Sequence, residues 1–333
     1  MAVSVGIGLT NACNLECAHC YRSTGPAVCL SLEDVRLICA RLTPTSFNLG
    51  TGENALHPEF GAIVEYLAGS GFKLSMASNG YSLLSMSDPL LRAFHDVEVS
   101  IDFASEAAQD AFRGAGNWQT VMAAIEHCRR SGVEVTILAT LMSVNVDQME
   151  PLAGLAGELG TCLRVNAYQP VRASRFTLSY DEFWDGFRRL LSAAKLVSTS
   201  EPVVNAVLGL DDLGGSPCGR QSIRFTPEGG IVPCVYWPDP ALRVSDPVWD
   251  ESSILASEQF RRARAVPKAC ASCPHVGSCG GGCASRRALF GALEQPDPYC
   301  PFARGEAVSL DFVRAAARDL PRGRNVCTTI VTP

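Results

Sequence analysis

The sequence lacks any run of about 18 consecutive apolar residues, the length that a membrane-spanning helix needs. Its first residues lack the basic stretch and apolar core of a signal peptide. It also lacks a sustained stripe of Lys and Arg, and its net charge is −6. These absences argue against membrane association, secretion and charge-driven binding of nucleic acid or anionic lipid. We therefore expect a cytoplasmic protein with neither membrane nor nucleic acid as a partner.

Cysteine, by contrast, is abundant, with 15 in 333 residues. Disulfides are rare in reducing compartments and the number is odd, so a disulfide framework is not expected. Ten cysteines fall at spacings typical of metal sites. The other five are scattered, and we interpret those in apolar stretches as small core side chains. The five are Cys29, Cys39, Cys128, Cys162 and Cys327.

The first 200 residues alternate short β-like segments with helical patterns. Strands are predicted at 3–9, 47–49, 73–77, 97–101, 133–141 and 162–167. Helices are predicted at 32–42, 60–70, 118–131, 147–159 and 181–196, with a further helix broken near Pro89. Six strand–helix units in series predict an α/β fold with a parallel sheet, in the form of a partial (β/α)6 TIM barrel.

Polar residues follow each predicted strand at its C-terminal end, where barrels carry their chemistry. They are a cysteine loop, residues 50–53, residues 78–80, Ser100 with Asp102, Asn145, and Tyr168 with Gln169. Beyond residue 200, Pro, Gly and Cys become dense and helical periodicity fades. We predict a barrel over 1–200, a cysteine-rich domain with little regular structure over 201–305, and a C-terminal helix and tail over 306–333.

The first cysteine motif is Cys13-x3-Cys17-x2-Cys20. Three thiolates at this spacing can bind three corners of a four-iron cluster, which usually takes four cysteines. No fourth ligand is predicted nearby, because Cys29 follows a Gly-Pro turn and is interpreted as structural. One iron would then be open to another ligand. The alternative is zinc, with His19 as fourth ligand, although a histidine between two of the cysteines would strain a tetrahedral site.

This motif, after an N-terminal strand, resembles the radical S-adenosylmethionine (SAM) superfamily. The resemblance implies that the open iron chelates SAM. It further implies reductive cleavage of SAM to a 5′-deoxyadenosyl radical that abstracts a substrate hydrogen. The barrel would orient the cofactor and exclude water. A reductant such as flavodoxin or ferredoxin would be a partner.

The resemblance also implies residues that bind SAM. The family's GGE motif corresponds to Thr51, Gly52 and Glu53, with Thr51 departing from the family glycine. Glu53 would accept a hydrogen bond from the SAM ammonium group. Further positions expected at SAM are Asn79, Ser100 and Arg113. The alternative for Asn79, Asp102 and Asn145 is that they only cap strands and turns. His57, before Pro58, is expected to be structural.

Seven more cysteines match the SPASM pattern of that superfamily, C-x9–15-G-x4-C, C-x2-C-x5-C-x3-C, C. The resemblance implies two auxiliary 4Fe–4S clusters, and hence three clusters in all. Auxiliary cluster I would take Cys218, Cys234 and Cys283. Its fourth site would be open, or filled by a non-cysteine group, by Cys327 or by substrate. Auxiliary cluster II would take Cys270, Cys273, Cys279 and Cys300. Two zinc sites are the alternative.

Auxiliary clusters in this family favour a net oxidation: dehydrogenation, crosslinking or thioether formation. Epimerisation is the redox-neutral alternative and needs a hydrogen donor such as a Cys thiol. Sulfatase-maturing members carry Asp where this chain has Val235, so formylglycine formation is not expected. Tyr236 and Asp239 are candidate catalytic residues, together with Cys327. Tyr168 and Arg172 are candidates to line the substrate site.

The substrate class is narrowed to two hypotheses. The favoured one is a ribosomally made peptide. Many peptide-modifying SPASM enzymes carry a leader-recognition domain before the barrel, and the first cysteine here already comes at residue 13, so a separate leader-binding protein is expected. The other is a small molecule such as a sugar or aminocyclitol in antibiotic biosynthesis. A third hypothesis, from another class, is a non-catalytic iron–sulfur electron carrier. The β-prone segment 326–331 is expected either to pair as an edge strand or to bring Cys327 toward a cluster.

Overall fold

The computed structural model describes residues 3–210, 218–220, 222–316 and 327–333. Its centre is one sheet with the strand order β10-β9-β8-β1-β2-β3-β4-β5-β6-β11-β7. Strands β1 to β6 are parallel and lie in chain order. Their bounds are Val3–Gly8, Pro44–Gly50, Lys73–Ser78, Asp96–Ser100, Glu134–Leu141 and Cys162–Ala167. The partial (β/α)6 barrel predicted from the sequence is confirmed.

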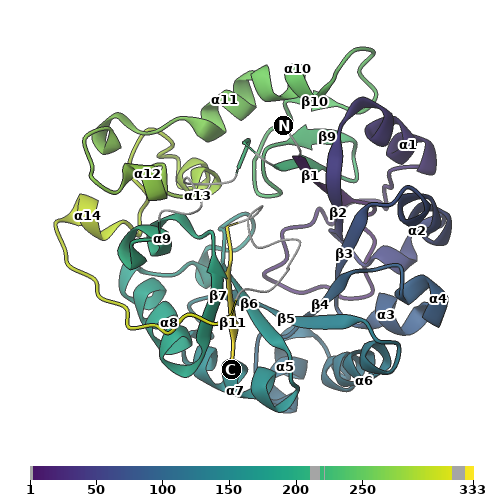
Figure 1. Cartoon of the computed structure of the whole chain (residues 1–333), viewed down its shortest axis with the longest axis horizontal. Coiled ribbons are helices and arrows are strands. Elements are labelled where there is room, and N and C mark those ends of the chain that lie inside the picture. The colour runs from purple at the N-terminus through teal and green to yellow at the C-terminus, as the bar shows by residue number, and fades with distance from the viewer. Residues whose placement is uncertain (1–2, 211–217, 221, 317–326) are drawn as a thin grey trace.

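Helices pack along the outer face of this curved sheet (Figure 1). They are α1 Leu32–Arg41, α2 Phe60–Gly69, α3 Tyr81–Ser85, α4 Asp88–Leu91, α5 Glu106–Arg113, α6 Asn117–Arg130, α7 Met149–Glu158 and α8 Tyr180–Ala193. Local sequence sets where a helix starts: Ser31 caps α1 in a capping box with Asp34. All residues of β1 are buried, as is usual for a parallel strand covered on both faces.

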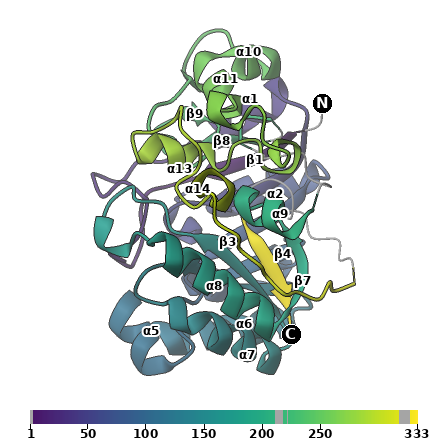
Figure 2. The ribbon, with the colours of Figure 1, turned by 90° about the vertical axis from the view of Figure 1, so that its left-hand side faces the viewer.

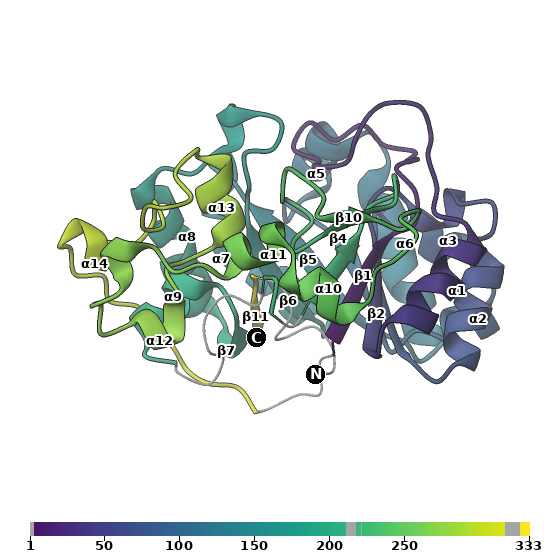
Figure 3. The same cartoon turned by 90° about the horizontal axis from the view of Figure 1, so that it is seen from above.

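The second region contains more regular structure than the sequence predicted. Its helices are α9 Pro202–Leu208, α10 Glu251–Ala256, α11 Glu258–Arg264, α12 Val276–Cys279, α13 Ala284–Leu289 and α14 Pro301–Arg304. Its strands are β8 Ser222–Phe225, β9 Gly230–Val232 and β10 Leu242–Arg243. Each element is too short to produce a periodic sequence pattern, which explains why the sequence did not reveal them. Figure 3 shows α12 to α14 on the side of the molecule opposite α1 to α3.

The two regions share one sheet. Strand β8 pairs in parallel with β1, with Val5 opposite Ile223, so the second region extends the barrel sheet beyond its first strand. Four short 3-10 helices complete the described elements, at Asn54–Leu56, Val146–Gln148, Ser174–Phe176 and Lys268–Cys270. No helix in the described ranges is long and apolar enough to span a bilayer.

The structure corrects three expectations about local elements. The helix predicted over 181–196 ends at Ala193, and β7 Lys195–Thr199 follows it directly. Helix α5 was not predicted. The tail does form a strand, β11 Thr329–Thr332, but it lies between β6 and β7 and is antiparallel to both, so it is not an edge strand. Figure 2 shows β11 in yellow beside β7.

The predicted C-terminal helix is not found in the described residues beyond 305. Neither 306–316 nor 327–333 is helical. The rest of that segment, 317–326, lies outside the described residues.

Candidate functional site

The cysteine loop leaves the C-terminal end of β1 and is tied back at its base. Asn11 donates its backbone N–H to the Val28 carbonyl at 3.2 Å and accepts from the Val28 N–H at 2.8 Å. The Cys29 thiol donates to the Thr10 hydroxyl at 3.2 Å. Cys29 therefore belongs to the base of the loop, in agreement with its structural interpretation.

Cys13, Cys17 and Cys20 line one cavity of about 240 Å³. The Leu15 N–H points at the Cys13 sulfur at 3.4 Å, and the Cys17 thiol donates to the Arg113 carbonyl at 3.9 Å. Burial raises the pKa of the Cys13 and Cys17 thiols. A bound cation reverses this effect, because coordinating thiols are deprotonated. The donor set, three thiols with N–H groups near sulfur, fits an iron–sulfur cluster.

The chain passes close beneath this loop at residues 51–53. A Cβ on Gly52 would lie 2.4 Å from the Thr10 carbonyl oxygen and 2.5 Å from that of Ala12, and Gly52 has φ +65°. The Glu53 N–H donates to the Ala12 carbonyl at 2.8 Å. Thr51 also has a positive φ, 71°, which is rare for a β-branched residue. Its hydroxyl hydrogen-bonds with that of Tyr21 at 3.0 Å.

The Glu53 carboxylate is buried and holds the loop after β3. It accepts from the Ser78 hydroxyl at 2.5 Å, the Asn79 N–H at 2.9 Å and the Ser82 N–H at 2.9 Å. Carboxylate oxygens have about four lone-pair sites, so one acceptor position remains for a ligand in the cavity. Glu53 lines that cavity together with Thr51 and Gly52.

Asn79 contacts the cysteine loop directly. Its side-chain amide donates to the Asn14 side chain at 2.8 Å and lies 3.7 Å from the Cys13 sulfur. Asn145, in contrast, donates to the carbonyls of Asp102 and Thr140 at 3.1 and 2.9 Å, and it does not line the cavity. The capping role considered for Asn145 is thus the one that its contacts support.

Arg113 reaches the cavity from the end of α5, beside Cys17. Asp102 holds its guanidinium, with N–O distances of 2.8 and 2.7 Å. His19 lies 3.6 Å from the same carboxylate and stacks on Phe112 with ring centroids 4.8 Å apart. Burial lowers the pKa of His19 to about 4, although Asp102 opposes the shift. His19 is therefore neutral near pH 7.

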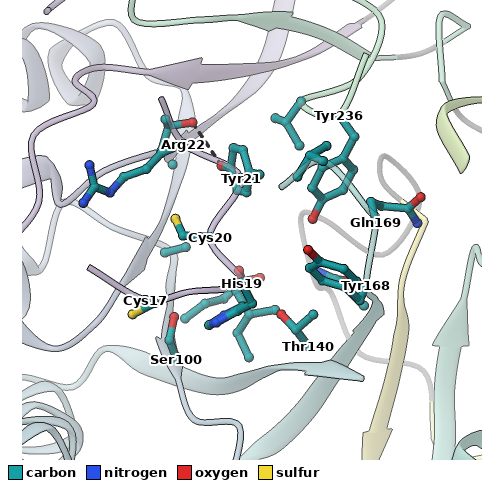
Figure 4. A pocket seen from close by; sticks show the side chains of 18 of the residues that line it. Cys17, His19, Cys20, Tyr21, Arg22, Ser100, Thr140, Tyr168, Gln169 and Tyr236 are labelled. Carbon is teal, nitrogen blue, oxygen red and sulfur yellow. Dashed lines mark hydrogen bonds between the residues drawn. The ribbon is translucent and has the colours of Figure 1, made fainter. Parts of the chain in front are cut away.

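The far side of the cavity carries two candidates for the substrate site, Tyr168 and Tyr236, together with Gln169. Figure 4 shows Tyr168, Gln169 and Tyr236 across the cavity from Cys17 and Cys20. The Tyr236 ring packs edge-on against Tyr21 with centroids 5.3 Å apart. Burial raises the pKa of Tyr236, which keeps its phenol protonated.

Two predicted candidates do not reach the cavity. Asp239 is exposed and is absent from the cavity lining. Arg172 is also not part of the lining, and it donates to the Thr24 hydroxyl at 3.1 Å. Val171, directly before Arg172, does line the cavity, and so does Tyr236, three residues before Asp239.

A buried ion pair inside the barrel was not predicted from the sequence. Arg164, from the middle of β6, bonds Glu98 of β4, and both line the cavity. Arg164 also donates to the hydroxyl of Thr328, in the C-terminal tail, at 3.0 Å. The sequence did contain a signal for this pair, because Glu98 and Arg164 each lie in the middle of a strand predicted to be buried. Buried charges are rare unless they are paired.

Part of the second cysteine set borders the same cavity. Cys218, Cys234, Cys283 and Cys327 all line it. The thiol of Cys327 hydrogen-bonds with those of Cys218 and Cys283, and the thiol of Cys234 hydrogen-bonds with that of Cys218. These hydrogen bonds are the largest cause of the raised pKa of Cys234 and Cys327. Burial of the two thiols is the next largest cause.

The other four cysteines of the SPASM pattern do not line the cavity; they are Cys270, Cys273, Cys279 and Cys300. Burial is the main cause of the raised pKa of Cys270, Cys279 and Cys300, with smaller contributions from neighbouring cysteines. Cys300 is one such neighbour for both Cys270 and Cys279, and Cys273 is one for Cys270 and Cys300. In the described part of the chain, no three His, Cys, Asp or Glu side chains are arranged around a single metal-ion position.

Comparison with known proteins agrees with the arrangement of the cysteine loop at the end of the barrel sheet. Residues 7–156 match the family described as the radical SAM superfamily. The mycofactocin maturase MftC of Mycobacterium tuberculosis (strain ATCC 25618 / H37Rv) is 29% identical over 350 residues, covering 95% of this chain and 86% of that protein.

Solved structures share the fold. The structure of anSMEcpe with bound AdoMet and Kp18Cys peptide has a TM-score of 0.71 at 17% identity, covering 92% of this chain and 95% of that one. Streptococcus suis SuiB bound to precursor peptide SuiA has a TM-score of 0.60 at 12% identity, covering 89% and 75%. The family match covers residues 7–156, the segment that carries Cys13, Cys17 and Cys20, so this part of the chain is a radical SAM domain.

Proposed function

We propose that this protein cleaves SAM reductively and uses the resulting radical for an oxidative modification of a ribosomally made peptide. The modification would be a crosslink, a thioether or a dehydrogenation. The observation that carries the proposal is that one cavity is lined both by Cys13, Cys17 and Cys20 and by Cys218, Cys234 and Cys283. A substrate held between them contacts both the centre that starts the radical reaction and one that can accept an electron.

Three 4Fe–4S clusters are part of this proposal. The first would be held by Cys13, Cys17 and Cys20; when bound, with SAM, it supplies the 5′-deoxyadenosyl radical. Cys218, Cys234 and Cys283 would hold auxiliary cluster I. Auxiliary cluster II would be held by Cys270, Cys273, Cys279 and Cys300. A flavodoxin or ferredoxin would supply electrons.

The chain's own residues bind and orient SAM. The free lone pair of Glu53 would accept from the SAM ammonium group, and the Gly52 backbone lets that end of SAM approach. Arg113, held by Asp102, places a cation where the SAM carboxylate would lie. Ser100, at the end of β4, would bind the ribose. Asn79 keeps the cysteine loop against the cavity through Asn14.

The peptide substrate is supported by the relatives. MftC is named a maturase, and both structural neighbours were solved with peptides bound. Tyr168, Gln169 and Tyr236 would orient the substrate. A protonated Tyr236 can donate a hydrogen bond to a peptide carbonyl, because burial raises its pKa. A separate leader-binding protein would complete the system.

Production of 5′-deoxyadenosine tests the enzyme claim. The Cys13→Ala, Cys17→Ala, Cys20→Ala triple variant should make none when reduced with dithionite, yet retain auxiliary iron. Cys39→Ala removes a half-buried thiol on α1 and should leave cleavage intact. Full cleavage by the triple variant, or none by the unaltered reconstituted protein with substrate, would leave the iron–sulfur electron carrier as the better hypothesis.

A labelled substrate tests the substrate class. Synthetic peptides translated from short reading frames beside the gene, deuterated at Cα and Cβ, should transfer deuterium into 5′-deoxyadenosine, seen by mass spectrometry. Transfer from a deuterated aminocyclitol, but from none of the peptides, would contradict the peptide proposal.

A further inference from the structure

The tail of the chain returns to the barrel and delivers one cysteine to the cavity. Strand β11 is antiparallel to β6, with Thr329 opposite Val165 and Val331 opposite Leu163. The N-terminal end of β11 therefore lies at the C-terminal end of β6. That end of the sheet is the one where the cavity lies, and Cys327 lines the cavity two residues before the strand begins.

The residue after Cys327 is held by several hydrogen bonds. The Thr328 carbonyl accepts from the Ser200 N–H at 2.7 Å, and its N–H donates to the Ser200 hydroxyl at 3.3 Å. Its own hydroxyl accepts from Arg164 at 3.0 Å and donates to the Val165 carbonyl at 3.2 Å. Thr328 is almost completely buried. Its neighbour Cys327 is thus attached to a fixed backbone.

The same frame continues to the other cysteines. Glu201, next to Ser200, bonds Arg286 at 2.6 Å. Arg286 bonds Asp297 at 2.7 Å, and Asp297 accepts from the Cys283 N–H at 2.8 Å. A chain of short polar contacts therefore fixes Cys283 and the Cys327 backbone relative to each other. This arrangement brings the Cys327 thiol into direct contact with the thiols of Cys218 and Cys283.

We propose that Cys327 is the fourth protein ligand of the cluster held by Cys218, Cys234 and Cys283. This inference rests on the auxiliary clusters of the proposed function. Four-iron clusters usually take four cysteines, and Cys327 raises this set from three to four. Binding releases the thiol proton as the sulfur becomes a thiolate ligand. Auxiliary cluster I then has no open iron, so it accepts electrons from substrate without binding substrate.

The test isolates the auxiliary clusters in the full chain. A background with Cys13→Ala, Cys17→Ala and Cys20→Ala removes the cluster that has an open iron. It is compared with the same background carrying Cys327→Ala. Each protein is reduced, mixed with ¹³C-cyanide and examined by electron paramagnetic and nuclear double resonance. Cyanide binds only at an iron that lacks a protein ligand.

The expected result is ¹³C coupling in the Cys327→Ala protein and none in the background. Loss of about four of the eight expected irons from the Cys327→Ala protein alone would support the inference equally. Cyanide binding in the background itself would overturn it, as would a Cys327→Ala spectrum identical to that of the background. The last result is the one expected if Cys327 acts as a hydrogen donor.

Two controls separate ligation from disturbance of the strand. Thr329→Val removes the 2.8 Å hydroxyl contact with Thr199 but keeps the cysteine. Cys39→Ala removes an unrelated thiol. Both should match the background in iron and cyanide response. If the background protein itself holds no iron, the proposal of auxiliary clusters is wrong, and the inference about Cys327 fails with it. That outcome differs from a loss of iron seen only in the Cys327→Ala protein.

Alkylation of the unaltered protein gives an independent measurement. With iron present, iodoacetamide should leave Cys327 and Cys283 unlabelled and label the exposed Cys29. Chelation of the iron should make Cys327 reactive together with Cys283. Labelling of Cys327 in the iron-loaded protein contradicts the inference even if the alanine variant does not fold.

Discussion

At the residue scale, the SAM end of the site depends on how closely two backbone segments approach. Gly52 lies against the carbonyls of Thr10 and Ala12, which precede the first cluster cysteine. Glu53 then ties this contact to the loop after β3 through three hydrogen bonds. One glycine and one carboxylate thus set the position of the cysteine loop relative to two strands.

Gly52→Ala should therefore lower stability by at least about 2 kcal/mol, from a positive φ and a clash with backbone that cannot move aside. It should also reduce iron bound by the cysteine loop. Gly61→Ala is the matched control, because a Cβ at this position of α2 meets no atom within 4 Å. That change should be neutral or stabilise by up to about 1 kcal/mol. Equal thermal midpoints for the two variants under anaerobic conditions would contradict the prediction.

At the element scale, one arginine joins the cysteine-rich region to the barrel. Arg286 of α13 is fully buried and bonds Glu201 before α9 and Asp297. Its guanidinium also lies over the rings of Phe183 in α8 and Tyr299, at 5.4 and 4.9 Å from their centroids. A buried ion pair is weak support for stability by itself, but removing one partner leaves unpaired charge.

Arg286→Met should cost about 3–5 kcal/mol, since two buried carboxylates lose their cation. Arg189→Met removes a surface pair with Asp185 on α8 and should cost no more than about 1 kcal/mol. Thermal unfolding of the iron-loaded proteins measures both.

The Arg286→Met deficit should depend on pH. Burial raises the pKa of Glu201 even beside Arg286, and loss of the arginine should raise it further. A carboxyl with a raised folded-state pKa binds protons more readily when folded, so its contribution to stability is lost as pH rises. The deficit should therefore be smaller at pH 6 than at pH 8. A deficit that grows on acidification would show that Glu201 is not the group left unpaired.

At the scale of the whole molecule, the C-terminus completes the sheet. Strand β11 lies between β6 and β7, so β7 is attached to the barrel through the tail. The strand is nearly all buried, with Val331 fully so between Leu163 and Leu196. The same strand carries Cys327 to the cavity.

Val331→Asp should consequently lower stability by at least about 3 kcal/mol, because it buries an unpaired charge. Release of the strand should expose the tail to proteolysis and withdraw Cys327 from the cavity. Thr332→Asp, at the half-buried end of the same strand opposite Lys195, should change stability by no more than about 0.5 kcal/mol. Circular dichroism melts and limited proteolysis would measure both effects. Equal protease resistance of the two variants would show that the strand is not held by this burial.

The sequence by itself determined the features that depend on neighbouring residues. The Cys13-x3-Cys17-x2-Cys20 loop, the six parallel strands and the helix that starts at Leu32 are local patterns, and they were predicted from spacing and periodicity. Tertiary structure decided the rest. The Glu98–Arg164 pair, the place of β11 and the contact of Cys327 with Cys218 and Cys283 join residues far apart in the chain. Such contacts leave no periodic pattern, because they depend on which segments the folded sheet brings together.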